Sequence, residues 1–273
     1  GGRDKGMSEA ECGEAAQEAV RGYREALADL FARSALERFA FQVETDAIEP
    51  LLRKEGREEL RRTVKKARKR TSEQVVQKIT TRSTDGRPRI VDQPPVTQHV
   101  DRVSVEELTV LFRQYREPLR ADVRLLLGQF ELVDFVLRVV GVGSVGTRCY
   151  ILLFEGPEGE ALVLQAKEAE TSVLSRYGGM PDALPSGLVP AGALPAQGRR
   201  VVTSQRILQA HSDPFLGWIT IEAPERTGRP RVDFFFRQFR DMKGSVELDR
   251  LAPAQFVRYG ELCGRVLARA HSQ

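Results

Sequence analysis

The feature that most constrains the fold is a glycine-rich turn between two runs of β-forming residues. Residues 141–146 (GVGSVG) match the pattern G-x-G-x-x-G, which two unrelated nucleotide-binding folds use. A dinucleotide-binding fold needs a helix directly after the glycines. Here residues 147–154 (TRCYILLF) are β-branched, apolar and aromatic instead. The pattern therefore predicts a strand, a glycine turn and a second strand.

A third β-forming run, residues 161–167 (ALVLQAK), ends on Lys167. In protein kinases a glycine-rich loop covers the ATP phosphates and the third strand supplies a lysine to them. The alternative interpretation is an exposed lysine on an edge strand. We favour a nucleotide-binding site, and its predicted residues in this segment are Gly141, Gly143, Ser144, Gly146 and Lys167.

Two positions depart from the kinase pattern. Arg148 stands where kinases usually carry an apolar residue that packs on the adenine. The helix predicted over residues 199–210 contains no acidic residue to pair with Lys167, as active kinases require. Gln205 of that helix can hydrogen-bond the lysine without neutralising it, so we include it in the site. Glu168 and Glu170, which flank the lysine, are the alternative partners.

Residues 232–244 (VDFFFRQFRDMKG) predict a strand that leads into a hinge, where the backbone would face the edge of an adenine. Arg237 and Gln238 therefore join the predicted nucleotide-binding residues. The run of three phenylalanines that precedes them is simple core packing for at least two of its members, Phe234, Phe235 and Phe236.

The first 130 residues are mainly helical in pattern. Ser8 and Glu11 form a capping box, which predicts a helix from there to about residue 34. Its apolar side chains recur at helical spacing and predict a core face of Val20, Tyr23, Leu27, Leu30 and Phe31. A second capping box at Ser104 and Glu107 predicts a helix to about residue 117, and a shorter helix follows over 121–129.

Turn-forming residues mark the connections. Asp85-Gly86 lies between alternating segments and predicts a hairpin over residues 77–91. Residues 177–198 are rich in Pro, Gly, Ser and Ala and predict a long loop. A strand over 215–221 and a closing helix over 256–270 complete the pattern.

A basic segment lies within a long helix predicted over residues 46–77. Residues 61–70 (RRTVKKARKR) carry seven basic side chains in ten. The segment is either a solvated helix face balanced by nearby glutamates or a patch for nucleic acid. We favour the solvated face, because no aromatic residue interleaves the charges and the formal net charge of the chain is only +4. Nucleic acid is thus an unlikely partner.

These patterns predict an α+β fold in two parts. Residues 1–130 form a helical segment with the hairpin, and residues 131–273 form a small antiparallel sheet resembling the N-terminal lobe of a protein kinase. The three cysteines lie far apart without metal-ligand spacing, which predicts reduced and mostly buried thiols. No apolar run is long enough to span a membrane and no signal core is evident, so we expect a cytoplasmic protein.

Several segments together resemble the bacterial domain of unknown function 2252 family. They include VVGVGSVGTRCYILL, LQAKEA, SDPFLGW, RQFRDMKG and CGRVLARAH, with further likeness in the N-terminal helix and in IVDQPPV. The resemblance implies a kinase-like fold without a settled substrate. It also implies a stretch resembling G-D-x-H-x-x-N-F and a later D-F-D before the first helix. Neither stretch is present, so the resemblance implies a fragment that lacks the catalytic aspartates.

The leading hypothesis is an ATP-binding, kinase-like module that uses Mg²⁺, whose complete form transfers a phosphoryl group to an unknown small molecule or protein. A non-catalytic, pseudokinase-like binding protein is the first alternative, and nucleic-acid binding through residues 61–70 is the second. We assign no catalytic residue and no metal ligand within the chain. His99, His211 and His271 have no serine or cysteine partner at a recognisable spacing.

Overall fold

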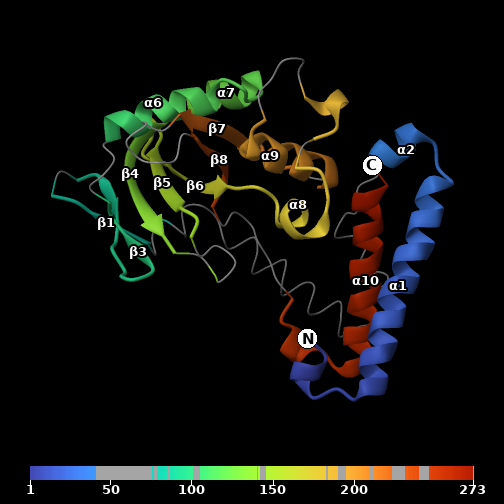
Figure 1. The fold of residues 1–273 in the computed structure, drawn as a ribbon. Helices are drawn as coiled ribbons and strands as arrows, with labels where there is room; N and C mark the ends of the chain where they lie inside the picture. The colour runs from blue at the N-terminus through green and yellow to red at the C-terminus, as the bar shows by residue number, and fades with distance from the viewer. Residues whose placement is uncertain are drawn as a thin grey trace. The chain divides into compact units, whose positions relative to one another are not determined.

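The computed structural model describes residues 1–40, 76, 79–84, 86–100, 105–139, 141, 146–182, 184–189, 195–209, 212–222, 231–239 and 246–272 (Figure 1). The chain divides into two compact units whose segments alternate along the sequence. The helical unit contains residues 1–68, 206–211 and 243–273, and the sheet unit contains residues 69–205 and 212–242. Residue 130, after which the sequence predicts a boundary, lies inside the sheet unit, and the last helix belongs to the helical unit because it packs on the first one.

The helical unit is built on two long helices that lie side by side, α1 (Glu9–Phe31) and α10 (Pro253–His271) (Figure 1). Shorter pieces accompany them: 3₁₀ turns at Arg3–Lys5 and Leu248–Arg250, and α2 (Ala35–Ala40). The predicted capping box is confirmed. The Glu11 amide donates to Ser8 Oγ at 3.3 Å, and the Glu11 carboxylate accepts from the Ser8 amide at 2.8 Å.

Small residues let the two helices approach closely. A Cβ atom placed on Gly264 of α10 would lie 2.1 Å from the Ala19 carbonyl oxygen. A Cβ atom on Gly22 of α1 would lie 2.7 Å from the Glu261 carbonyl oxygen. Real Cβ atoms do not approach so closely, so the contact requires glycine at both positions.

The predicted core face of α1 is partly wrong. Leu30 is buried, and Tyr23 and Leu27 pack against its cluster with Ala26 and Ala268. Val20 and Phe31, however, are 58% and 56% exposed. Contact through small residues turns the face of α1 that carries Ala15, Gly22 and Ala26 toward α10, and this rotates Val20 and Phe31 outward.

The sheet unit is built on a six-stranded antiparallel sheet with the order β3-β4-β5-β6-β8-β7. The strand bounds are Thr97–Gln98 (β3), Glu131–Arg138 (β4), Cys149–Glu155 (β5), Ala161–Ala169 (β6), Gly217–Glu222 (β7) and Arg231–Gln238 (β8). The strands predicted on either side of the glycine turn and those predicted over 161–167, over 215–221 and from residue 232 are confirmed. The predicted hairpin is confirmed as β1 (Thr80–Arg82) paired with β2 (Pro88–Ile90).

The helices of this unit are α6 (Val105–Arg116), α7 (Ala121–Leu127), α8 (Val173–Gly178) and α9 (Gln197–Leu208), whose last three residues belong to the helical unit. The predicted helices near 104–117, 121–129 and 199–210 are thereby confirmed. The predicted loop over 177–198 contains a 3₁₀ turn, Ser186–Leu188, and overlaps the end of α8. The helix predicted over 46–77 falls outside the described residues, apart from Val76.

The sheet buries apolar side chains on both faces. One face packs against α6, where Tyr115 is fully buried, stacks on Phe236 at 4.3 Å between ring centroids and donates its hydroxyl to the Phe215 carbonyl. Phe234 belongs to the same cluster, so two of the three phenylalanines are core residues as predicted. The opposite face forms a smaller cluster of Ile90, Val136, Ile151, Leu153, Val163 and Phe239.

The thiols are free, and only Cys149 of the three is buried; Cys12 is half-buried and Cys263 is exposed. The prediction of mostly buried thiols is therefore wrong, because Cys263 lies on the solvent side of α10. Among the helices of the described ranges, none combines the length and apolar character required to cross a membrane.

The close helix contact predicts an asymmetric response to added methyl groups. We expect Gly264→Ala to destabilise the helical unit by about 1–3 kcal/mol, because the new Cβ meets backbone atoms of α1. Gly13→Ala is the control, since a Cβ at this position of α1 meets nothing within 4 Å. It should be neutral or stabilising by up to about 1 kcal/mol. Urea unfolding of both variants measures the difference, and equal stability would contradict the close contact.

Candidate functional site

The register of the sheet gathers polar side chains on one face around Lys167. Lys167 of β6 lies directly opposite Cys149 of β5 and Phe235 of β8. Gln165, two residues earlier, lies opposite Arg237 of β8. Directly opposite residues of antiparallel strands project to the same side of the sheet. The face that carries Cys149, Gln165, Lys167 and Arg237 is called the Lys167 face below.

Two hydrogen-bonding groups on the Lys167 face are buried with poor partners. Gln165 is 7% exposed, and its Nε2 donates to Cys149 Sγ at 3.1 Å. Sulfur is a weak acceptor, so this amide is weakly satisfied. Arg237 Nε is buried and has no hydrogen-bond partner among the residues that the structure describes. Burial raises the pKa of the Cys149 thiol, which outweighs the opposing influence of Gln165 and of the cations Lys167 and Arg138.

Three cations converge on this face from three different strands. Lys167 comes from β6, Arg237 from β8 and Arg138 from the end of β4. Arg138 follows Val136 by two residues on the strand, and its guanidinium lies 5.5 Å from the ring centroid of Phe239 in the same cluster. No described residue forms a hydrogen bond or ion pair with the Lys167 ammonium. The face therefore carries positive charge beside buried donors.

The glycine turn joins β4 and β5 at the end of the sheet where Arg138 and Cys149 lie. Gly141 and Gly146 have φ angles of +37° and +89°, a region that favours glycine. The predicted Gly143 and Ser144 belong to the part of the turn that the structure leaves undescribed. The first and last glycines of the turn, Gly141 and Gly146, thus lie at the end of the sheet that carries Lys167.

Helix α9 packs on the same face, beside β7. Trp218 of β7 lies opposite Phe235, in the row of Lys167. A Cβ on Gly198 would be 3.0 Å from the Trp218 Cβ, and the Arg199 guanidinium lies 4.7 Å from the Trp218 ring centroid. Gln205 lies two turns after Gly198 on α9 and is half-buried. The structure thus brings the helix of Gln205 to the face of Lys167, without a described contact between the two side chains.

Arg148 and Glu168 lie on the opposite face and bind each other. Arg148 Nε lies 2.9 Å from Glu168 Oε2, its Nη2 lies 3.2 Å from Oε1, and the Arg148 amide also donates to this carboxylate at 2.9 Å. The Arg148 guanidinium lies 5.6 Å from the Phe234 ring centroid, on the α6 side of the sheet. Cys149, rather than Arg148, therefore shares the face of Lys167, and the Glu168 carboxylate binds Arg148 on the other face. Of the two alternative partners considered for Lys167, Glu168 is thus bound to Arg148 instead.

The two predicted residues at the end of β8, Arg237 and Gln238, also lie on opposite faces of the sheet. Arg237 projects to the Lys167 face, whereas the alternation of the strand directs the Gln238 side chain to the face of Phe236. The Gln238 amide donates to Asp213 Oδ2 at 2.6 Å. The predicted hinge over residues 240–244 lies outside the described part of the chain.

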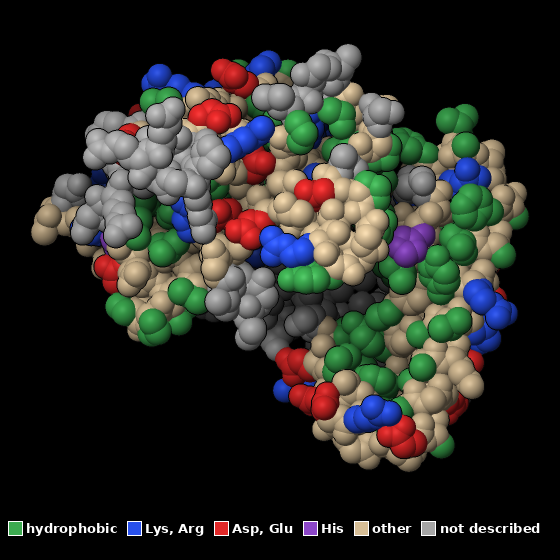
Figure 2. Space-filling view, viewed as in Figure 1, with side chains coloured by type: hydrophobic (Ala, Val, Ile, Leu, Met, Phe, Trp, Pro, Cys, Tyr) green, Lys and Arg blue, Asp and Glu red, His purple; other side chains and the backbone are tan. Residues whose placement is uncertain are grey.

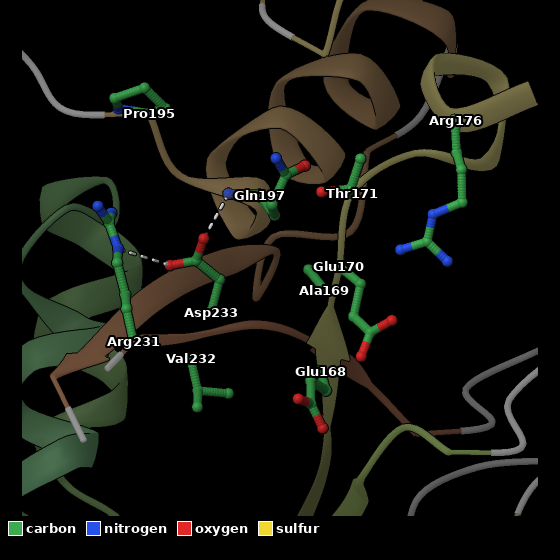
Figure 3. Close-up of a pocket in the computed structure, with 10 residues that line it drawn as sticks. All are labelled: Glu168, Ala169, Glu170, Thr171, Arg176, Pro195, Gln197, Arg231, Val232 and Asp233. Carbon is green, nitrogen blue, oxygen red and sulfur yellow. Dashed lines mark hydrogen bonds and ion pairs between the residues drawn. The ribbon is translucent and has the colours of Figure 1, made fainter. Parts of the chain in front are cut away.

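A pocket of about 420 Å³ opens where β6 ends, beyond Lys167 (Figure 3). It is lined by charges of both signs from β6, α8, α9 and β8, and its residues are Glu168, Ala169, Glu170, Thr171, Arg176, Pro195, Gln197, Arg231, Val232 and Asp233. Sequence analysis missed this pocket, because its residues come from four elements. The available signal was Asp233, a lone acid at the start of an otherwise apolar strand.

Asp233 fixes the start of α9 beside this pocket. Asp233 is 8% exposed. Its carboxylate accepts hydrogen bonds from the Gln197 amide at 2.5 Å and from the Thr220 hydroxyl at 2.6 Å. Arg231 Nε lies 3.7 Å away and adds an ion pair (Figure 3). The acid therefore caps the helix from a neighbouring strand and holds α9 against the Lys167 face.

His99 joins the β3 segment to β4 through two carboxylates. Its Nδ1 lies 2.9 Å from Asp92 Oδ1, and its Nε2 lies 3.1 Å from Asp134 Oδ1. Only the protonated imidazole can donate from both nitrogens. Burial alone would lower the pKa of His99, but the hydrogen bonds to Asp92 and Asp134 raise it overall. The group is thus a structural clamp rather than a catalytic base.

The described residues give no support for a metal site or for a nucleic-acid-binding surface. No group of three or more His, Cys, Asp or Glu side chains able to hold a metal ion occurs among them. Acidic and basic side chains are interspersed on the side of the molecule that Figure 2 shows, without an extended basic patch among the described residues. The basic segment 61–70 itself lies outside the described ranges.

Comparison with known families gives one match. A family model described as an uncharacterized protein conserved in bacteria (DUF2252) matches residues 1–273. Neither the curated proteins nor the solved structures that were compared with the chain include a match. The match covers both units, and it is the family that the sequence motifs resemble.

The capping role of Asp233 predicts a large loss of stability on its removal. We expect Asp233→Ala to lower the free energy of unfolding by about 2–4 kcal/mol, since the Gln197 amide, Thr220 and Arg231 lose their acceptor. Glu222→Ala, an exposed acid at the end of the neighbouring β7, is the matched control and should change little. Hydrogen exchange of the α9 amides should speed up in the first variant alone. Unchanged exchange in α9 would show that Asp233 does not hold the helix.

The His99 clamp predicts a pH-dependent contribution to stability. Because the folded pKa lies above the ordinary value, the stabilisation is complete below about pH 6.5 and is lost as the pH rises through the raised pKa. Urea unfolding between pH 5.5 and 8.5, as an approximate experimental range, should show this loss in the wild-type chain. His99→Gln should remove that component of the pH dependence. An identical pH profile in both proteins would exclude the clamp.

Proposed function

Since the chain belongs to the bacterial DUF2252 family, whose description names no reaction, we propose a function from its own residues: it binds ATP with Mg²⁺ as a kinase-like module. The observation that carries the proposal is the convergence of Lys167, the glycine turn and α9 on one face and one end of the sheet. These are the parts with which protein kinases hold the phosphates of ATP.

The order of the elements along the chain supports this proposal. β4, the glycine turn, β5 and the lysine-bearing β6 follow one another as a meander, and α9 follows before the last two strands. In protein kinases the lysine lies on the third strand and the next long helix contributes to its environment. Lys167 stands on the third strand of this meander and on the face that α9 covers in part.

Electrostatics supports an anionic ligand. Lys167 and Arg237 have no acidic partner among the described residues, and Arg138 lies near them on β4. At an effective dielectric constant of about 20, two opposite unit charges about 4 Å apart attract by about 4 kcal/mol. A triphosphate would therefore gain substantially from these cations. Backbone amides of the glycine turn would add donors without a side chain in the way.

A second candidate is a non-catalytic, pseudokinase-like nucleotide-binding protein. The specific observation in its favour is the commitment of Glu168 to Arg148 on the opposite face, together with the absence of acids from α9. Active protein kinases need a lysine–glutamate pair next to the phosphates. In this candidate Lys167 holds the nucleotide and Gln205 supplies a hydrogen bond at most. Phosphoryl transfer to a small molecule or a protein is the corresponding step of the first candidate.

Substitution of the lysine tests nucleotide binding directly. We expect Lys167→Ala to weaken binding of a fluorescent ATP analogue in Mg²⁺ buffer by about tenfold or more, since a charge-assisted hydrogen bond contributes about 1.5–3 kcal/mol. Arg113→Ala, an exposed cation on α6, is the control and should bind as the wild type does. Equal affinity of wild type and Lys167→Ala would remove Lys167 from the site. Sustained Mg²⁺-dependent ATP hydrolysis that Lys167→Ala loses would exclude the non-catalytic candidate.

A further inference from the structure

We propose that the pocket at the end of β6 binds a small zwitterion of the α-amino-acid class, with Glu170 as the partner of its ammonium group and Arg176 as the partner of its carboxylate. The inference goes beyond the proposed function, because it does not depend on a nucleotide. It rests on which charged side chains around the pocket are already engaged by the protein and which are not (Figure 3).

The pocket has the size of a small-molecule site. Its volume of about 420 Å³ lies within the range of about 300–1,000 Å³ that is usual for such sites. Its walls come from the end of β6, the start of β8, α8 and the start of α9. All of its lining residues belong to the sheet unit, so the site does not require the helical unit.

One side of the pocket is satisfied by contacts within the protein. The Asp233 carboxylate accepts from the Gln197 amide and from the Thr220 hydroxyl. Arg231 Nη2 donates to the same hydroxyl at 3.2 Å. The Gln197 side chain donates to Asp182 Oδ2 at 2.6 Å. These groups join α9 to β7 and β8, and their hydrogen bonds leave little capacity for a ligand.

The other side of the pocket carries a carboxylate and a guanidinium that no described residue engages. Glu170 extends from the end of β6 and Arg176 from α8, on the side of the view away from Arg231 (Figure 3). The two side chains line the same cavity without forming an ion pair with each other. Glu168, a further acid at this end of β6, is bound to Arg148. One charge of each sign is therefore left for a ligand.

An α-amino acid carries both complementary groups in one small molecule. Its ammonium group can donate to the Glu170 carboxylate, and a guanidinium such as that of Arg176 can bind its carboxylate through two parallel hydrogen bonds. The hydroxyl of Thr171, which also lines the pocket, can donate or accept. Glu170 and Arg176 are exposed, so each contact alone is weak. Selectivity for a zwitterion follows because only such a ligand makes both contacts.

The test compares probes that carry both charges with probes that carry one. L-Alanine and L-glutamine are zwitterions, propionate keeps only the carboxylate of alanine, and ethylamine keeps only its ammonium group. Saturation-transfer NMR with the full chain measures the binding of each. We expect both amino acids to bind at least about tenfold more tightly than propionate or ethylamine. Equal binding of all four probes, or no binding of either amino acid, would overturn the inference.

Hydrogen exchange locates the bound probe. Gln197 lines the pocket and is the first residue of α9, so a ligand held there should stabilise the start of this helix. L-Alanine should therefore slow exchange of the first amides of α9, and propionate at the same concentration should not. Protection by L-alanine confined to other elements would place the amino acid elsewhere and contradict the site.

Substitution of the two charged side chains gives a charge-specific second arm. Glu170→Gln should abolish the preference for L-alanine over propionate, and Arg176→Ala should abolish the preference over ethylamine, each with a loss of about tenfold in L-alanine affinity. Glu158→Gln and Arg113→Ala change exposed charges of the same sign outside the pocket and are the matched controls. Unchanged selectivity in Glu170→Gln and Arg176→Ala would overturn the inference.

Lys167→Ala separates this inference from the proposed function. Amino-acid binding should persist in Lys167→Ala, because Lys167 does not line the pocket. Its loss in this variant, with Glu170→Gln and Arg176→Ala unaffected, would place the ligand on the Lys167 face and remove the inference. Nucleotide binding that depends on Lys167 can stand or fall without changing this result.

Discussion

The antiparallel register of β6 between β5 and β8 is the constraint on which the candidate site depends. Because side chains alternate along a strand, a slip of one residue would exchange the two faces and move Lys167 to the side of α6. The register is held by apolar side chains on both faces, with Leu164 packed against the α6 cluster and Val163 against the β2 cluster. The packing of the core therefore decides which cations meet: it brings Lys167 and Arg237 to one face and directs Arg148 to the other.

The helices and strands of the sheet unit could be predicted from the sequence, because their periodicity and their turn residues are local signals. The strands expected on either side of the glycine turn are present as β4 and β5, and those expected beside Asp85-Gly86 are present as β1 and β2. The face on which each side chain of β5 lies could not be predicted, since an offset of one residue leaves its apolar pattern almost unchanged. For this reason the sequence does not reveal that Arg148 and Glu168 pair on the face opposite Lys167.

Contacts between distant segments account for the other differences. The pairing of α1 with α10 depends on Gly22 and Gly264, which are more than 240 residues apart and have no apolar side chain to signal a contact. The cap that Asp233 provides to α9 comes from a strand that follows the helix in sequence, so the usual search for a capping residue before Gln197 cannot find it. Both features require knowledge of which elements meet in space, which depends on the packing of the whole chain.

The same packing explains why the candidate site can carry poorly satisfied donors. An amide such as Gln165 and a buried guanidinium nitrogen such as that of Arg237 oppose folding unless they find acceptors. They are tolerated here because Ile151, directly opposite Gln165, and Val163, two residues before Gln165 on β6, are fully enclosed and stabilise the sheet. Enclosed apolar side chains and poorly satisfied donors thus lie side by side on one face: the apolar side chains hold the strands in register, and the donors keep unfilled hydrogen-bonding capacity. A ligand that supplies oxygen acceptors would then add binding and folding free energy at the same place.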